Sequence, residues 1–283
     1  MRLLDGKKLA QEIKQNISAE VARLRQDGAR LPKLALVLVG DRPDSVSYVN
    51  SKEKNCATLG LLCEKHHLPE EVSQDMLLEL IAQLNVDETV DGILVQLPLP
   101  AHLDTDLVLD AVDYRKDADG LHPVNLGLML KGTPYVLPCT PHGILRLLQD
   151  NGIVVDGRRA VVVGRSMLVG TPTALLLQQH HATVTQCHTH TRDLAEICQQ
   201  ADIVVTATGV PGLLRPEELK EGAVLVDVAM NHDDDGLCGD VYSRQTAPVL
   251  EQRLEAATPV PGGVGPMTIA MLMYNVLDLY RKH

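Results

Sequence analysis

The sequence predicts a two-domain α/β protein built on parallel sheets. Short apolar runs that end in Gly or turn residues alternate with stretches whose apolar residues recur at helical spacing. This alternation occurs twice, and a segment rich in Gly, Pro and His at about 117–142 separates the two series. A length of 283 residues is sufficient for two domains of roughly 100–150 residues each.

The first series opens with an amphipathic helix, which Gly28 ends. The apolar residues at helical spacing are Leu9, Ile13, Ile17, Val21 and Leu24. Continuous apolar runs over 33–40 and 91–100 predict buried parallel strands. The stretches 45–60 and 76–85 predict helices between these strands.

The second series repeats the pattern after the separating loop. Its apolar runs predict strands over 159–164, 182–187, 202–209 and 223–229. The segment 267–280 is strongly apolar for a terminal helix, so we expect it to pack against another part of the protein, the first domain being one solution. Loop composition alone places the domain boundaries near 120–145 and 255–265.

Charge and aromatic content argue against a nucleic-acid partner. The formal net charge is -11, Trp and Phe are absent, and six Tyr are the only aromatic residues of the Phe/Trp/Tyr class. A nucleic-acid binder normally needs a basic surface and often aromatic platforms for base stacking. Any anionic ligand must therefore be held by local groups.

The cysteines predict neither a disulfide framework nor a metal site. They are scattered, without a CxxC pair or close His spacing: Cys56, Cys63, Cys139, Cys187, Cys198 and Cys238. Free thiols fit a reducing cytoplasm. Charges interrupt the apolar residues of the N-terminal segment, and no run reaches the roughly 18 apolar residues of a membrane span, so we expect no signal peptide and no membrane association.

A strand-to-helix turn in the second series suits a phosphate. The strand over 161–163 runs into Gly164, and a helix is predicted from about Gly170, with Ser166 between them. The positive end of a helix dipole and free backbone N–H groups favour an anion at such a junction. The spacing departs from GxGxxG, so the turn alone fits both a dinucleotide site and a purely structural connection.

The next strand favours NADP over NAD. An NAD site would place an acidic residue about 20 residues on, where it binds the ribose 2′-hydroxyl. Cys187, His188 and Thr189 stand there instead, so no carboxylate repels a 2′-phosphate. Arg165 would attract that phosphate, although a solvated surface arginine is the alternative interpretation.

Polar residues in the first series form a second candidate site. Tyr48 and Lys52 are four residues apart in a predicted helix and share one face. The YxxxK spacing is typical of short-chain dehydrogenases, but in those enzymes the pair follows the cofactor loop, whereas here it precedes it. Gln96 ends a predicted strand and Asp119 lies in a Gly-flanked loop. From spacing alone, each of these residues could also be an ordinary surface or turn residue.

Six segments together resemble one known family. They are YVNSKEKNCATLG, DGILVQLPLP, DADGLHPVN, PCTPHGI, VVVGRSMLVGTP and PVPGGVGPMTIAML. In this order, over almost the whole chain, they resemble the bifunctional methylenetetrahydrofolate dehydrogenase/methenyltetrahydrofolate cyclohydrolase family. The resemblance implies a folate-binding catalytic domain over 1–140 plus 262–283, a Rossmann-like NADP-binding domain over 141–261, a cleft between them, and a homodimer. It implies oxidation of 5,10-methylenetetrahydrofolate with NADP, then hydrolysis of the methenyl product to 10-formyltetrahydrofolate.

The resemblance also assigns residues. Catalytic roles fall to Lys52, Tyr48, Gln96 and Asp119, with Lys52 central. The folate would contact these four together with Leu97, Pro261, Gly262 and Gly263. NADP would contact Gly164, Arg165, Ser166, Thr189 and Met230. Ala229 and Met230 stand where the family more often has Gly and Ile, which puts the local pocket shape in question.

Three alternatives stay open at this point. Another two-domain dehydrogenase, of the amino-acid or shikimate type, would share the architecture but not the PVPGGVGP and VQLPLP loops. A non-catalytic Rossmann regulator would bind NADP without turnover. A monofunctional methylenetetrahydrofolate dehydrogenase is the nearest alternative, and Lys52 in its motif is the one argument against it.

Overall fold

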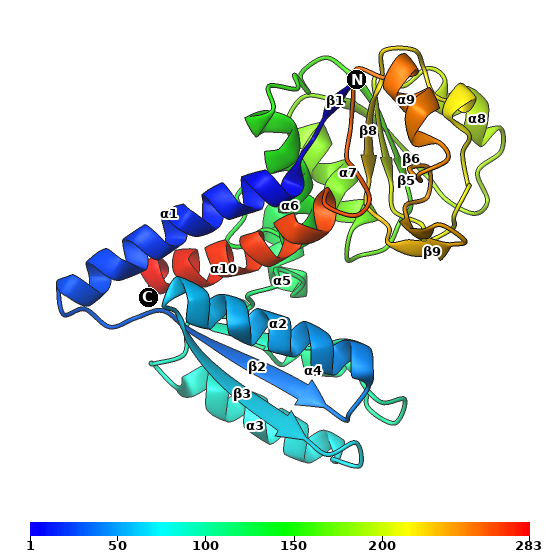
Figure 1. Ribbon diagram of the computed structural model, residues 1–283. Coiled ribbons are helices and arrows are strands. Elements are labelled where there is room, and N and C mark those ends of the chain that lie inside the picture. Colours follow the sequence, from blue (N-terminus) through cyan, green and yellow to red (C-terminus); the bar gives the residue numbers. More distant parts are fainter. The chain divides into compact units, whose positions relative to one another are not determined.

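A computed structural model describes residues 1–283, and the chain divides into two compact units. Unit 1 consists of Met1–Gln11 and Pro138–Thr268, and unit 2 of Glu12–Leu137 and Ile269–His283. Helices α1 (Gly6–Gln26) and α10 (Val264–Lys282) each contribute to both units (Figure 1). Each unit is built on its own parallel sheet, which confirms the two-domain α/β class.

The sheet of unit 2 has three parallel strands in the order β3-β2-β4. Strands β2 (Lys33–Val39) and β4 (Gly92–Val95) confirm the two predicted apolar strands, and β4 ends before the prolines of the VQLPLP segment. Strand β3 (Leu62–Leu68) was not predicted. It lies at the sheet edge and its sequence, LCEKHHL, is mostly polar, so it has no apolar run to reveal it.

Helices cover the sheet of unit 2. Four helices lie wholly within this unit: α2 (Pro43–Leu59), α3 (Gln74–Val86), α4 (Thr105–Asp110) and α5 (Pro123–Leu130). Alternate side chains of β2 and β4, including Val37 and Ile93, form one buried cluster with Leu77 and Ile81 of α3. Such burial of an apolar face is the main stabilising contribution to the unit.

The part of α10 in unit 2 ties several segments together. The Cys56 thiol lies 3.6 Å from the Met273 sulfur. The buried Asn275 amide donates to the carbonyls of Ala118 and Leu137, each at 3.0 Å. The strongly apolar terminal helix of the sequence thus has substantial packing partners within this unit.

Ser73 caps the N-terminus of α3, where its hydroxyl accepts a hydrogen bond from the Met76 amide at 3.3 Å. We expect Ser73→Ala to lower the free energy of unfolding by about 1 kcal/mol, because one helix N–H loses its partner. Urea denaturation followed by circular dichroism measures this change. Ser47→Ala, at an exposed position inside α2, is the control, and equal effects of the two substitutions would contradict the capping role.

The segment predicted as a loop at 117–142 contains regular structure, which corrects that prediction. It holds α5, and α6 (Cys139–Asp150) begins near its end. Pro123 occupies the first turn of α5, and the His122 ring nitrogen Nδ1 accepts the Val124 N–H at 3.1 Å. His122 and Pro123 therefore cap and begin a helix, although Pro and His are also typical of the loop that the sequence predicts here.

Unit 1 has a six-stranded parallel sheet in the order β1-β11-β8-β7-β5-β6. Its strands are β1 (Arg2–Leu3), β5 (Arg159–Val163), β6 (Thr183–Cys187), β7 (Ile203–Thr206), β8 (Val224–Asp227) and β11 (Ala256–Ala257). The four predicted strands are confirmed. Because β1 pairs with β11, residues 1–11 belong to this unit, whereas the sequence prediction grouped them with residues 12–140.

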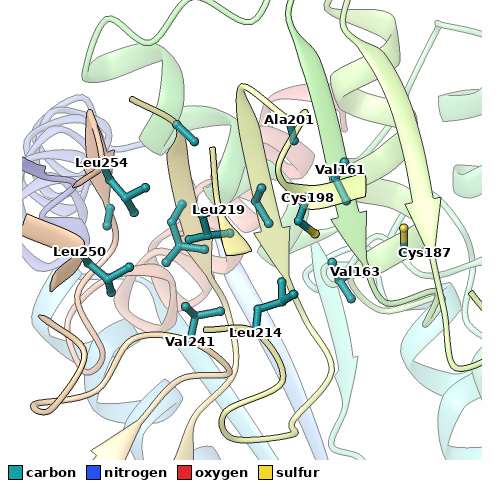
Figure 2. Packing of buried hydrophobic residues seen from close by; sticks show 14 residues of the cluster. Val161, Val163, Cys187, Cys198, Ala201, Leu214, Leu219, Val241, Leu250 and Leu254 are labelled. Carbon is teal, nitrogen blue, oxygen red and sulfur yellow. The ribbon is translucent and has the colours of Figure 1, made fainter. Parts of the chain in front are cut away.

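Helices α6 and α7 (Gly170–Gln179) belong to unit 1, as do the short helices α8 (Leu194–Cys198) and α9 (Ala247–Arg253). The 3-10 turn η1 (Pro216–Glu218) and the antiparallel hairpin β9 (Asn231–Asp233) and β10 (Gly236–Cys238) complete the unit. Figure 2 shows one side of the sheet, where Val161 and Val163 lie in a buried cluster with Cys198 and Leu250. No helix in either unit has the length and apolar character needed to cross a bilayer.

Candidate active site

The carboxyl edge of the unit 2 sheet brings Lys52 and Gln96 together. The backbone N–H of Gln96 donates a hydrogen bond to the Val37 carbonyl of β2 at 2.8 Å, so Gln96 is fixed directly after β4. Its side chain is 9% exposed, and its Oε1 accepts a hydrogen bond from Lys52 Nζ at 2.8 Å. Gln96 Nε2 in turn donates to the Leu97 carbonyl at 2.6 Å. Both ends of the amide are thus held, so Gln96 orients the lysine.

Tyr48 lies one turn before Lys52 on α2 and is 50% exposed. Residues four apart share a helix face, so the phenol and the amine can serve one site. The exposed Tyr48 side chain, one helix turn from the half-buried Lys52, is available to a ligand. The structure therefore brings Lys52 and Gln96 into contact and places Tyr48 one helix turn from Lys52, and the catalytic roles of the three residues stay predictions.

Asp119 reaches the same edge because the chain before it runs beside β4. The Ile93 amide donates to the Lys116 carbonyl at 2.6 Å, and the Ala118 amide donates to the Ile93 carbonyl at 3.2 Å. Residues 116–118 therefore extend the sheet, and Asp119 follows where β4 ends. Asp119 and Leu97 line one small cavity of about 20 Å³.

A buried carboxylate shapes the loop that carries Asp119. Asp117 accepts hydrogen bonds from the backbone amides of Gly120 and His122, at 3.0 and 2.8 Å, and from the side-chain amide of Asn125 at 2.9 Å. Burial raises the pKa of the Asp117 carboxyl, while these hydrogen bonds act in the opposite direction. The two aspartates of DADG thus have different roles. Asp117 is buried and stabilises the loop, whereas Asp119 is half-buried and lines a cavity.

In unit 1, the turn after β5 depends on two glycines. Gly164 has a φ of +129°, and a Cβ there would lie 2.6 Å from the Ala207 carbonyl oxygen. A Cβ at Gly170 would lie 2.3 Å from the Gly164 carbonyl oxygen. Only glycine allows this close approach between the strand end, the start of α7 and the segment after β7. The turn therefore leaves its backbone close to any ligand at the carboxyl ends of β5 and β7.

A cavity of about 260 Å³ lies beside this turn. Its lining consists of Val163, Gly164, Arg165, His188, Thr189, Leu194, Ala207, Thr208, Val210 and Leu213. Because β5 is flanked by β6 on one side and β7 on the other, the cavity lies at the point where the strand order reverses, the usual ligand position in doubly wound sheets. Of the predicted cofactor residues, Gly164, Arg165 and Thr189 meet here.

Two predicted cofactor residues are placed differently. The Ser166 hydroxyl accepts the amides of Val169 and Gly170 at 3.2 and 3.4 Å, so it organises the start of α7. Met230 follows β8, is 52% exposed, and does not line the cavity. Ser166 and Met230 therefore stay predictions for cofactor binding.

Sequence reasoning did not select several residues of this cavity. Thr208 and Val210 follow β7 and flank Gly209, whose φ of +72° makes a turn. The Gly at the end of the apolar run 202–209 was the available signal, because ligand loops follow strand ends in α/β sheets. His188, immediately after β6, also lines the cavity. From the sequence alone, this position showed only that no acidic residue stands at the end of β6.

The segment Pro261–Gly263, predicted to contact folate, lies in unit 1. The Gly262 carbonyl accepts the Lys7 amide at 2.9 Å, and a Cβ at Gly6 would lie 1.8 Å from the Gly263 carbonyl oxygen. These glycines therefore have a structural role at the start of α1. Their contact with a ligand stays a prediction.

Two family models match this chain, each over a different part of the sequence. Residues 4–119 match the model for the catalytic domain of tetrahydrofolate dehydrogenase/cyclohydrolase. Residues 138–283 match the model for the NAD(P)-binding domain of the same enzymes. The two matches together cover most of the sequence.

Individual proteins agree with these family models. The bifunctional protein FolD of Moorella thermoacetica is 49% identical, with 99% of both chains covered, and that of Sulfurihydrogenibium sp. is 48% identical over 100% of this chain and 98% of the relative. The crystal structure of the Campylobacter jejuni bifunctional FolD superposes with a TM-score of 0.94 at 43% identity and full coverage of both chains. The Trypanosoma brucei enzyme, solved with NADP and an inhibitor, gives a TM-score of 0.91 at 38% identity, covering 99% of this chain and 97% of its own.

Proposed function

Because this chain belongs to the tetrahydrofolate dehydrogenase/cyclohydrolase family, we propose that it performs both reactions of the bifunctional enzymes. It oxidises 5,10-methylenetetrahydrofolate to 5,10-methenyltetrahydrofolate with NADP. It then hydrolyses the methenyl compound to 10-formyltetrahydrofolate. The observation that carries the second activity is the Lys52 amine held on Gln96 at the end of β4.

The residues of unit 1 fit NADP. Gly164 leaves room for a ligand at the carboxyl end of β5, Arg165 borders the cavity, and no carboxylate lines it. A guanidinium beside a 2′-phosphate supplies charge-assisted hydrogen bonds. When bound, NADP supplies the nicotinamide that accepts a hydride from the methylene carbon. The protein's part is to bind and orient, because the two nitrogens that flank this carbon stabilise the methenyl cation.

Hydrolysis depends on Lys52 in this proposal. Water adds to the methenyl carbon and loses a proton as the new C–O bond forms. Lys52 Nζ orients the water or takes that proton, Gln96 fixes the position of Nζ, and Tyr48 orients the amine and the folate from the neighbouring helix turn. The bond between this carbon and N5 then breaks as the new hydroxyl becomes a carbonyl, the hydroxyl proton passes to N5, and the 10-formyl product results.

Substrate recognition is assigned to two loops at the carboxyl edge of the unit 2 sheet, the one after β4 and the one that carries Asp119. The Asp119 carboxylate accepts hydrogen bonds from the amino-pyrimidine edge of the pterin, and Leu97 contacts the folate beside it. Pro261, Gly262 and Gly263 present backbone to the folate, and Ser166 and Met230 complete the NADP contacts. The folate-binding region corresponds in this proposal to residues 1–140 and 262–283, and the NADP-binding region to 141–261.

Assembly and compartment are part of the same proposal. We assign a homodimer in the cytoplasm, with tetrahydrofolate one-carbon derivatives as the partners and neither nucleic acid nor membrane. All six cysteines are free, as is usual in a reducing compartment. Light scattering coupled to size exclusion measures the mass of the particle, and a mass of one chain would refute the dimer.

Two spectrophotometric assays on the purified chain test the function. The first follows reduction of NADP or NAD with 5,10-methylenetetrahydrofolate. At the same limiting concentration of nucleotide, we expect faster turnover with NADP than with NAD. The second follows loss of methenyltetrahydrofolate without nucleotide. Turnover in the first assay alone would identify a monofunctional dehydrogenase, and turnover in neither would overturn the proposal.

A further inference from the structure

Asp240 is a buried carboxylate in unit 1 whose hydrogen bonds converge on the loop beside the NADP cavity. Its side chain is 0% exposed. One oxygen, Oδ2, accepts both the backbone amide and the hydroxyl of Thr208, each at 2.8 Å. The other, Oδ1, accepts the Val210 amide at 2.9 Å and the Asn231 side-chain amide at 3.1 Å. Four donors thus fill the acceptor positions that a carboxylate offers.

A second buried carboxylate holds Asp240 itself. Asp227 ends β8, and it accepts the amide of Asp240 at 2.9 Å and the hydroxyl of Thr206 at 3.0 Å. A Cβ on the preceding residue, Gly239, would lie 2.2 Å from an Asp227 oxygen, so the chain passes directly over this carboxylate. The backbone of Asp240 is therefore held in place by Asp227 and cannot shift with the loop that carries Thr208 and Val210. Its position is set by the sheet.

The loop that Asp240 holds is part of the cavity wall. Ala207, Thr208 and Val210 all line the cavity, and the Ala207 carbonyl is the group that a Cβ on Gly164 would strike. The side chains of Thr208 and Val210 are not buried, so packing alone does not fix them. The hydrogen bonds to Asp240 fix the positions of Thr208 and Val210, and they thereby set the distance between this loop and the Gly164 turn.

We propose that Asp240 is a positioning residue for NADP, acting through Thr208 and Val210 to hold the cavity wall opposite the Gly164 turn. The inference rests on the proposed binding of NADP in this cavity. A carboxylate is required because all four groups around it are donors. An asparagine would turn an NH₂ toward one pair of them, and in either orientation a backbone amide, that of Thr208 or that of Val210, loses its hydrogen bond to residue 240; the Val210 amide then keeps only the longer contact to the Thr208 hydroxyl at 3.2 Å.

The test is Asp240→Asn, with the equilibrium Kd for NADP, the KM for NADP, and the rate of methenyl hydrolysis measured on the same preparation. We expect NADP to bind about ten-fold more weakly, as loss of one buried acceptor predicts. The nucleotide-independent hydrolysis, assigned to unit 2, should stay within about two-fold of the wild type, because Asp240 lies in unit 1 and the hydrogen bond between Lys52 and Gln96 lies in unit 2. A fall in both activities by the same factor would overturn the proposal, because a general loss of structure explains it.

Asp202→Asn is the matched control. Asp202 also accepts a backbone amide, that of Arg159 at 2.9 Å, but it precedes β7 and lies at the opposite end of the strands from the cavity. This variant should change NADP affinity less than two-fold. Equal Kd values for the two variants would overturn the inference while the wild type still binds NADP, whereas absence of NADP binding by the wild type would overturn the proposed function as well.

Thr208→Val decides the matter if Asp240→Asn does not fold. It removes the hydroxyl that donates to Asp240 at 2.8 Å and accepts the Val210 amide at 3.2 Å, and it retains the shape and the backbone amide of the residue. We expect a few-fold weaker binding of NADP with unchanged hydrolysis. Unchanged NADP binding in this variant would overturn the positioning role.

Discussion

Lys52→Met should abolish hydrolysis of methenyltetrahydrofolate, with a loss of about 10²- to 10⁴-fold, the usual contribution of a positioned acid–base group. Methionine has similar length but can neither donate to Gln96 Oε1 nor hold a proton, so the attacking water loses its partner. Decay of methenyl absorbance measures the rate. Circular dichroism and the Kd for NADP should be those of the wild type, because the cavity lined by Gly164 and Arg165 belongs to the other unit.

Lys54→Met is the matched control for this prediction. Lys54 is exposed on the same helix, so the substitution makes the same change of charge and volume away from Gln96. Hydrolysis by the control should be nearly unchanged. Full hydrolysis by the Lys52 variant would refute the proposed role of the amine and leave the dehydrogenase assignment standing.

Arg165→Ala should weaken NADP binding by about 10- to 100-fold and leave NAD binding nearly unchanged. A hydrogen bond to a charged group is worth about 1.5–3 kcal/mol, and each 1.4 kcal/mol is ten-fold in affinity. The arginine is exposed at the cavity and lies immediately after Gly164, and NAD has no 2′-phosphate for it to contact. Equilibrium titration with each nucleotide measures the difference.

The control for this prediction is Arg146→Ala. Arg146 lies on α6 in the same unit, where it pairs with Asp150 at 2.8 Å, and it does not line the cavity. It should leave both affinities unchanged. If Arg165→Ala weakens NADP and NAD equally, the arginine shapes the turn in general and the 2′-phosphate assignment is wrong.

The sequence was most informative where burial imposes a simple pattern. Strand β2 from Leu34 onward and strand β8 are buried and contain continuous apolar runs, and the apolar residues of α1 recur at clear helical spacing. Strand β3 has no fully buried residue and is mostly polar, and β11 is two residues long, so neither offers enough apolar positions to detect. Pairing of the chain start with β11 is a long-range property that no local pattern encodes.

The candidate sites divide in a similar way. The helix spacing of Tyr48 and Lys52 is local and could be read directly, but the bond from Lys52 to Gln96 joins residues from different elements, and only the order of the family's segments indicated it. Asp240 was missed altogether. Its sequence context is a short turn after β10, and its importance arises from the four donors that folding brings to it.

The pairing of β1 with β11 has a consequence for biosynthesis. Arg2 and Leu3 form the outermost strand of the unit 1 sheet, and they leave the ribosome long before their partners, Ala256 and Ala257, are made. Nor is unit 2 contiguous, since it needs Ile269–His283 as well as Glu12–Leu137. A nascent chain therefore cannot complete unit 1 before Ala257 is made or unit 2 before residues 269–283 are made, and β1 stays unpaired until β11 has been synthesised.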